Sequence, residues 1–198
     1  MNGVGGRAFK GKKFKWLIAD PMFTIPFASD IVSWLGCESV GKRNMLKRMK
    51  SSANIGLIPG GFEEATIFAH DHHRVFIRNR RGFVKYALQH GYKVHPVYSF
   101  GEEKTYYAFP YFLNARLWLN KWKIPAVAFF GFLLPFLPKP KVDLVTVVGT
   151  GIPFPTISNP TPKDVDQYHT KYVEELRNLF DKHKSKYASN ETATMEFF

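Results

Sequence analysis

The sequence contains almost no cysteine. Its single Cys37 cannot form an internal disulfide, and no second cysteine is present to help build a zinc site. This composition favours a reducing, intracellular location, with Cys37 as a small packing residue. A chain of 198 residues can bury a core without such support, so we expect one domain.

Long hydrophobic runs are also absent. The most apolar uncharged stretch, residues 124–138, is shorter than the roughly 20 residues of a spanning helix and is interrupted by Pro125, Gly131 and Pro135. The first residues contain no apolar segment typical of a cleavable secretory signal. Because residues 124–138 are costly to expose to water, we expect this stretch to touch a membrane without crossing it or to line an acyl tunnel.

Acidic residues are few compared with basic ones, 16 against 28, which gives a net charge of +12. This balance indicates an anionic partner, such as nucleic acid, anionic lipid or a phosphate-bearing cofactor. No RNA-recognition motif, zinc finger or basic zipper supports nucleic acid. Aromatic residues, 16% of the chain, favour lipid or acyl chains, although a rich aromatic core beneath a solvated basic face explains the composition equally well.

Short apolar runs alternate with amphipathic segments, which predicts an α/β fold with a layered mixed sheet and flanking helices. The predicted strands are 14–18, 55–58, 74–77, 93–100 and 144–148, and the predicted helices are 29–35, 42–50, 82–90 and a long helix from 162. The basic helix 42–50 either docks on the core by its Met and Leu side chains or lies on an anionic membrane. We expect the domain to span residues 1–188, followed by a frayed tail, 189–198.

A glycine pair follows the predicted strand 55–58. Gly60 and Gly61 allow the backbone to turn sharply and to approach a ligand closely, and Glu63 and Glu64 come next. The alternative interpretation is a strand-ending turn with solvated acidic residues at the start of a helix.

Basic side chains gather at the start of the predicted helix 82–90. Free backbone amides and the helix dipole there add to the charges of Arg78, Arg80, Arg81 and Lys85. This arrangement suits phosphate groups such as those of coenzyme A, and a solvated basic turn is the alternative.

Glu102 follows the predicted strand 93–100, at the carboxyl edge where open α/β sheets commonly bind ligands. His70, His72 and His73 cluster in a predicted polar loop between Phe68 and Val75. Adjacent histidines in an extended loop point to different sides, so we predict neither a metal site nor an acid–base pair there.

Taken together, these segments resemble the diacylglycerol acyltransferase type 2 family, which also contains monoacylglycerol and wax-alcohol acyltransferases. The resemblance runs nearly the whole length of the chain. Its blocks are Gly60-Gly61-Phe62-Glu63-Glu64, residues 78–88 (Arg-Asn-Arg-Arg-Gly-Phe-Val-Lys-Tyr-Ala-Leu), residues 96–102 (Pro-Val-Tyr-Ser-Phe-Gly-Glu), 146–149, 159–161, 168–170 and 179–184.

The resemblance implies a glycerolipid-acyltransferase-like fold, with residues 1–188 as the C-terminal part of an acyltransferase domain. It implies transfer of a fatty acyl group from acyl-CoA to diacylglycerol, forming triacylglycerol at the endoplasmic reticulum membrane or a lipid droplet. Monoacylglycerol or wax alcohol is the alternative acceptor. Acyl-CoA is a co-substrate, and no cofactor or metal is implied.

The sequence departs from the family in one large respect. The His-Pro-His-Gly motif, which supplies the family's general-base histidine, does not occur. We therefore expect a fragment, in which Glu64 is the supporting catalytic residue, as orienter or electrostatic partner of that histidine. The expected substrate-binding residues are Gly60, Gly61, Arg78, Arg80, Arg81, Gly82 and Glu102, with the arginines directed toward coenzyme A and Glu102 as a structural or polar site residue. A non-catalytic basic protein that binds membranes is the alternative from another class.

Because the general-base histidine is absent, we predict that the purified chain forms no triacylglycerol from labelled acyl-CoA and diacylglycerol above the rate of an Arg80→Ala, Glu64→Ala double variant. Product formation above that control would show that the chain already contains a complete catalytic site.

Overall fold

A computed structural model describes residues 11, 13–24, 28–108, 111–122, 129–131 and 138–198. The predicted uncharged stretch 124–138 lies largely outside these residues. In chain order the helices are α1 (Ala28–Trp34), α2 (Lys42–Lys50), α3 (Gly61–Ile67), α4 (Gly82–Gln89), α5 (Leu113–Lys121) and α6 (Pro162–Tyr187). Two short 3-10 helices are η1 (Asp20–Phe23) and η2 (Glu102–Lys104).

The strands are short and form several separate ladders. They are β1 (Phe14–Ile18), β2 (Glu38–Ser39), β3 (Asn54–Leu57), β4 (His73–Val75), β5 (Lys93–Val94), β6 (Val97–Phe100), β7 (Tyr107–Ala108), β8 (Phe129–Phe130), β9 (Val145–Val148), β10 (Ile152–Pro153) and β11 (Met195–Phe197). The content of helix and strand agrees with the predicted α/β class. Within the described ranges, however, the strands make one parallel sheet, β2-β1-β3, and four two-stranded ladders rather than one layered mixed sheet.

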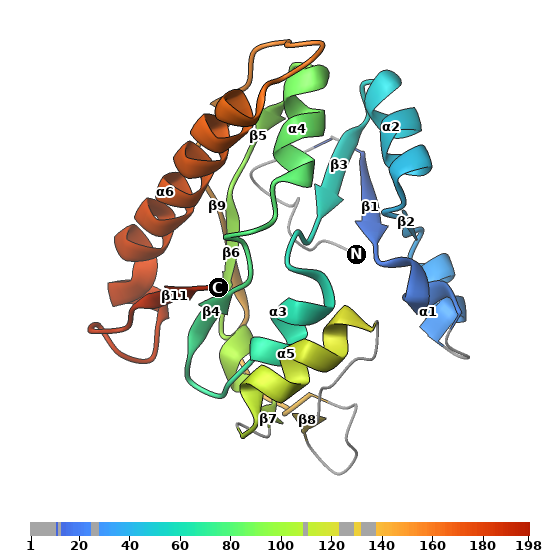
Figure 1. Ribbon diagram of the computed structural model, residues 1–198. Coiled ribbons are helices and arrows are strands. Elements are labelled where there is room, and N and C mark those ends of the chain that lie inside the picture. Colours follow the sequence, from blue (N-terminus) through green and yellow to red (C-terminus); the bar gives the residue numbers. More distant parts are fainter. Residues whose placement is uncertain (1–10, 12, 25–27, 109–110, 123–128, 132–137) are drawn as a thin grey trace.

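The core lies between α4 and α6. The buried side of α4 contributes Val84 and Leu88, which belong to the same apolar cluster as Tyr172 and Leu176 of α6. Figure 1 shows α6 running along one side of the molecule beside α4, β6 and β9. This long helix begins as predicted, because Thr161 and Asp164 form a reciprocal capping box.

A smaller apolar cluster joins α2 to β1. Met45 and Met49 of α2 are buried against Leu17. The structure therefore confirms that this basic helix docks on the core through its apolar stripe.

One strand prediction and one loop prediction are corrected. The predicted strand 93–100 is divided into β5 and β6 at His95 and Pro96, where proline cannot donate a ladder hydrogen bond. His73 was expected in a polar loop, but it begins β4 and is only 4% exposed.

The predicted frayed tail is also corrected, because β11 pairs in parallel with β4. At its end, the Phe198 carbonyl accepts hydrogen bonds from the amides of Ile77 (2.9 Å) and Arg78 (2.8 Å). Glu196 adds an ion pair with Arg74, with 3.0 Å between Nε and the carboxylate oxygen. The last residues thus fasten the backbone that leads into the arginine segment.

Deleting residues 195–198 should lower the free energy of unfolding by roughly 2–4 kcal/mol, since each lost hydrogen bond contributes about 1 kcal/mol. Urea denaturation measures the loss, and hydrogen exchange should show faster exchange at the Ile77 and Arg78 amides. Thr194→Ala, at an exposed position before the strand, is the control. Unchanged exchange in the truncated chain would mean that the tail does not hold this loop.

Candidate functional site

The turn between β3 and α3 depends on its two glycines. Gly61 has φ +64°, a left-handed conformation that L side chains rarely adopt. At Gly60, an added Cβ would overlap the Glu64 carboxylate, which folds back over the turn. The glycine pair therefore makes room for the Glu64 side chain.

Glu64 is half-buried, and its environment favours the protonated form. Burial raises the pKa of Glu64 to about 7, and the nearby Glu102 carboxylate acts in the same direction. A hydrogen bond from the Gly60 backbone and the charge of Arg80 oppose this shift in pKa. Glu64 can therefore gain or lose a proton near neutral pH.

Arg80 joins the arginine segment to the glycine turn. Its guanidinium Nη2 donates to the Gly60 carbonyl at 3.2 Å and pairs with the Glu63 carboxylate, and the group lies 5.1 Å from the centre of the Phe76 ring. Its Nε is buried and has no hydrogen-bond partner in the described part of the chain. The glycine turn and the arginine segment, which were expected to contribute to one site, are thus in direct contact.

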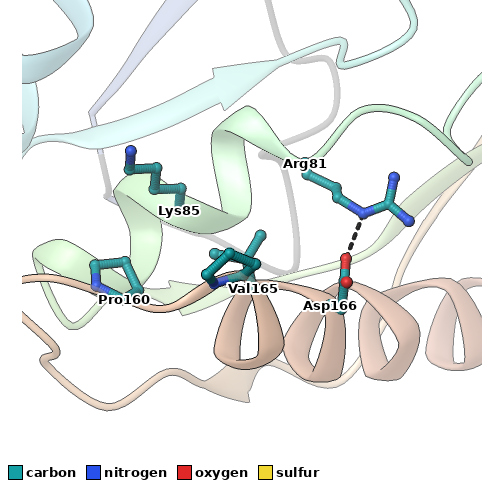
Figure 2. A pocket seen from close by; sticks show the side chains of 6 residues that line it. Arg81, Lys85, Pro160, Val165 and Asp166 are labelled. Atoms are coloured by element: carbon teal, nitrogen blue, oxygen red, sulfur yellow. Dashed lines mark hydrogen bonds and ion pairs between the residues drawn. The ribbon is translucent and has the colours of Figure 1, made fainter.

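Arg81 turns away from this turn. It pairs with Asp166 on α6, and its Nη1 donates to the Arg78 carbonyl at 3.1 Å. Figure 2 shows this pair among the residues that line an open pocket. The pocket has a volume of about 430 Å³. The pocket is lined by Arg81, Lys85, Pro160, Pro162, Val165 and Asp166.

The predicted arginine group is therefore divided between two places. Arg80 lies at the glycine turn, whereas Arg81 and Lys85 line the pocket between α4 and α6. Arg78 and Gly82 are both exposed, Gly82 as the first residue of α4. An anion in the pocket would meet Lys85 and an arginine that Asp166 already partly neutralises.

Glu102 lies at the start of η2, and the residue as a whole is exposed. Protein atoms around its carboxylate reduce the contact of that group with water and so raise its pKa, and the charge of Glu103 acts in the same direction. Its influence on Glu64 indicates that the two carboxylates are near each other. The sequence predicted both as site residues, and the charge of Glu102 helps to raise the pKa of Glu64.

Sequence reasoning missed a buried polar network behind these carboxylates. His73 Nδ1 lies 2.9 Å from the Tyr98 hydroxyl and 3.8 Å from the Glu103 carboxylate, and His73 and Glu103 are each only 4% exposed. Burial lowers the pKa of His73, although the Glu103 charge opposes that change. The glutamate pair after Gly101 was the available signal, but nothing in the sequence indicated that His73 would face it.

No group of three or more potential metal ligands occurs among the residues that the structure covers. In the same residues, no helix is long and apolar enough to cross a bilayer.

Comparison with known proteins gives a consistent result over the whole chain. The family model described as diacylglycerol acyltransferase matches residues 3–198. The chain is similar to diacylglycerol O-acyltransferase 2 of Dictyostelium discoideum and to acyl-CoA wax alcohol acyltransferase 2 of Mus musculus, each 34% identical over 94% of this chain and 60% of the relative. It is also similar to 2-acylglycerol O-acyltransferase 1 of Bos taurus, 34% identical over 88% of this chain and 56% of the relative. The chain thus spans less than two thirds of these relatives, and no solved structure matches it.

The raised pKa of Glu64 predicts a pH-dependent cost of folding. The folded protein binds this proton more tightly than the unfolded chain, so stability contributed by protonated Glu64 is lost as pH rises from about 4.5 to about 7. Glu64→Gln should therefore gain roughly 1–3 kcal/mol relative to the unsubstituted chain between pH 5 and pH 8. Urea denaturation at both pH values measures this difference, with exposed Glu174→Gln as control. Parallel stability profiles for the chain and Glu64→Gln would contradict the assigned environment.

Proposed function

Because this chain belongs to the diacylglycerol acyltransferase family, we propose that it carries part of the active site of an enzyme that transfers a fatty acyl group from acyl-CoA to diacylglycerol. The observation that supports this most directly is the contact between Arg80 and the Gly60–Glu64 turn. It unites the two most specific sequence blocks around a carboxyl group that titrates near neutral pH.

In the proposed reaction, the acceptor hydroxyl attacks the thioester carbonyl. The new ester C–O bond forms, the C–S bond breaks, and coenzyme A leaves as a thiolate that takes up a proton. A general base removes the hydroxyl proton, and donors stabilise the negative charge on the carbonyl oxygen. Glu64 orients that base or supports its charge, and burial together with the Glu102 charge keeps the proton affinity of Glu64 high.

The arginines act on the acyl donor. The buried Nε–H of Arg80 is a donor with no acceptor in the described residues, and we propose that an anionic group of the substrate approaches it when the turn opens. Lys85 and Arg81 offer a second positive region in the open pocket between α4 and α6, suited to a coenzyme A phosphate.

The acceptor has a second candidate class. Relatives of equal identity are named for diacylglycerol, wax alcohol and 2-acylglycerol, so a long-chain alcohol or a monoacylglycerol is the alternative to diacylglycerol. Since these acceptors are lipids, we place the reaction at the endoplasmic reticulum membrane or the lipid-droplet surface.

The proposal predicts that this chain binds a non-hydrolysable thioether analogue of acyl-CoA. Arg80→Ala should weaken binding on the order of tenfold, because a charge-assisted hydrogen bond is lost. Isothermal titration calorimetry measures the affinity, with exposed Lys171→Ala on α6 as the control.

An Arg80→Lys variant separates charge from geometry in the same assay. Lysine keeps the charge but cannot bridge the Gly60 carbonyl, Glu63 and a ligand at once, so it should recover only part of the affinity. Failure of the chain to bind the analogue, or equal binding by Arg80→Ala, would overturn the proposed donor site.

A further inference from the structure

Helix α5 buries two polar side chains and exposes large aromatic ones. Arg116 and Asn120, four residues apart, are each only 9% exposed, and Asn120 Nδ2 donates to the Thr66 hydroxyl at 2.6 Å. On the other side, Trp118 is 55% exposed and Trp122, the C-cap residue, is 67% exposed. Helices at a water-exposed surface place polar side chains outward and apolar ones inward, so the exposed Trp118 and Trp122 depart from that pattern.

The aromatic surface continues beyond α5. We call it the aromatic end, and its residues are Tyr107, Tyr111, Phe112, Trp118, Trp122 and Phe130, all more than half exposed. Tyr107 of β7 lies opposite Phe130 of β8 in an antiparallel pair, and the two tryptophan rings are 6.1 Å apart. Figure 1 shows α5, β7 and β8 gathered at one end of the molecule.

The charge of this region is one-sided. In the sequence 104–144 the one acidic residue is Asp143, whereas Lys104, Lys121, Lys139 and Lys141 are all at least partly exposed. Lys121 and Lys141 are exposed, and Lys139 Nζ lies 4.1 Å from the centre of the Tyr107 ring. Tyrosine and tryptophan rings with lysines around them match the boundary of a lipid bilayer, where rings lie at headgroup level and lysines reach phosphates.

We propose that the aromatic end docks in the plane of an anionic phospholipid bilayer, with Trp118 and Trp122 inserted at the boundary between headgroups and acyl chains. A second copy of the chain is a poorer occupant, because two copies would bring together surfaces of the same charge. An anionic bilayer complements both the aromatic rings and the lysines. This inference does not depend on acyl transfer, since it concerns a surface outside the Gly60–Glu64 turn.

Vesicle flotation tests the docking surface with this chain. Vesicles of phosphatidylcholine mixed with phosphatidylserine should carry the chain upward, and vesicles of phosphatidylcholine alone should carry much less. The Trp118→Ala, Trp122→Ala variant should lower the partition coefficient on the order of tenfold. Trp34→Ala is the matched control, because Trp34 is 86% exposed but lies on α1, outside the aromatic end.

A charge variant tests the electrostatic part. Lys121→Glu, Lys141→Glu should lower binding to phosphatidylserine vesicles by at least about tenfold and reduce its salt dependence. The same exchange at exposed Lys163 and Lys171 on α6 should have a much smaller effect. All positions are exposed, and circular dichroism checks that each variant folds.

Three outcomes would overturn the proposal. The chain could fail to float with either vesicle, or the Trp34 variant could lose as much binding as the double tryptophan variant. Light scattering could instead show a dimer that the double tryptophan variant converts to a monomer while vesicle binding stays unchanged. That result would assign the aromatic end to a second copy.

Discussion

The contact between the Arg80 guanidinium and the glycine turn organises the candidate site. It joins backbone segments 20 residues apart and brings a positive charge against Glu63 and into range of Glu64. Glu63 and Glu64 therefore have different surroundings. Glu63 is paired with the Arg80 cation, whereas Glu64 is largely shielded from water and lies within the influence of the Glu102 charge. Two glutamates that are adjacent in the sequence thus lie in different electrostatic environments.

Helix α6 holds in place the loop that carries Arg80. Its apolar side packs against α4, and His169 donates from Nε2 to the Ile77 carbonyl at 2.9 Å. The amide of Ile77 bonds to the Phe198 carbonyl, so both backbone groups of this residue are used. The loop that carries Arg78 and Arg80 is therefore fixed from two sides by residues from the end of the chain.

Local patterns predicted the local elements well. The strand 14–18, the helix 42–50 and the start of the long helix at residue 162 are found as predicted, because periodicity and capping involve residues within a few positions of each other. The joining of the Gly60 turn to the arginine segment followed from a family resemblance rather than from periodicity.

The missed features depend on contacts between distant residues. Residues 195–197 are too short to indicate a strand until their partner, more than 120 residues earlier, is known. The burial of His73 likewise follows from packing on Phe100 and Phe180. The separate directions of Arg80 and Arg81 follow from acids on different elements, Glu63 on α3 and Asp166 on α6. No pattern along the sequence indicates which acid each arginine meets.

The position of Phe198 has a practical consequence for protein engineering. Because its carbonyl is bonded to the amides of Ile77 and Arg78, any peptide fused to the carboxyl terminus would emerge beside the arginine loop. A polyhistidine label or a fluorescent reporter fused there would lie against that loop, so a long flexible spacer or a removable label keeps the loop uncovered.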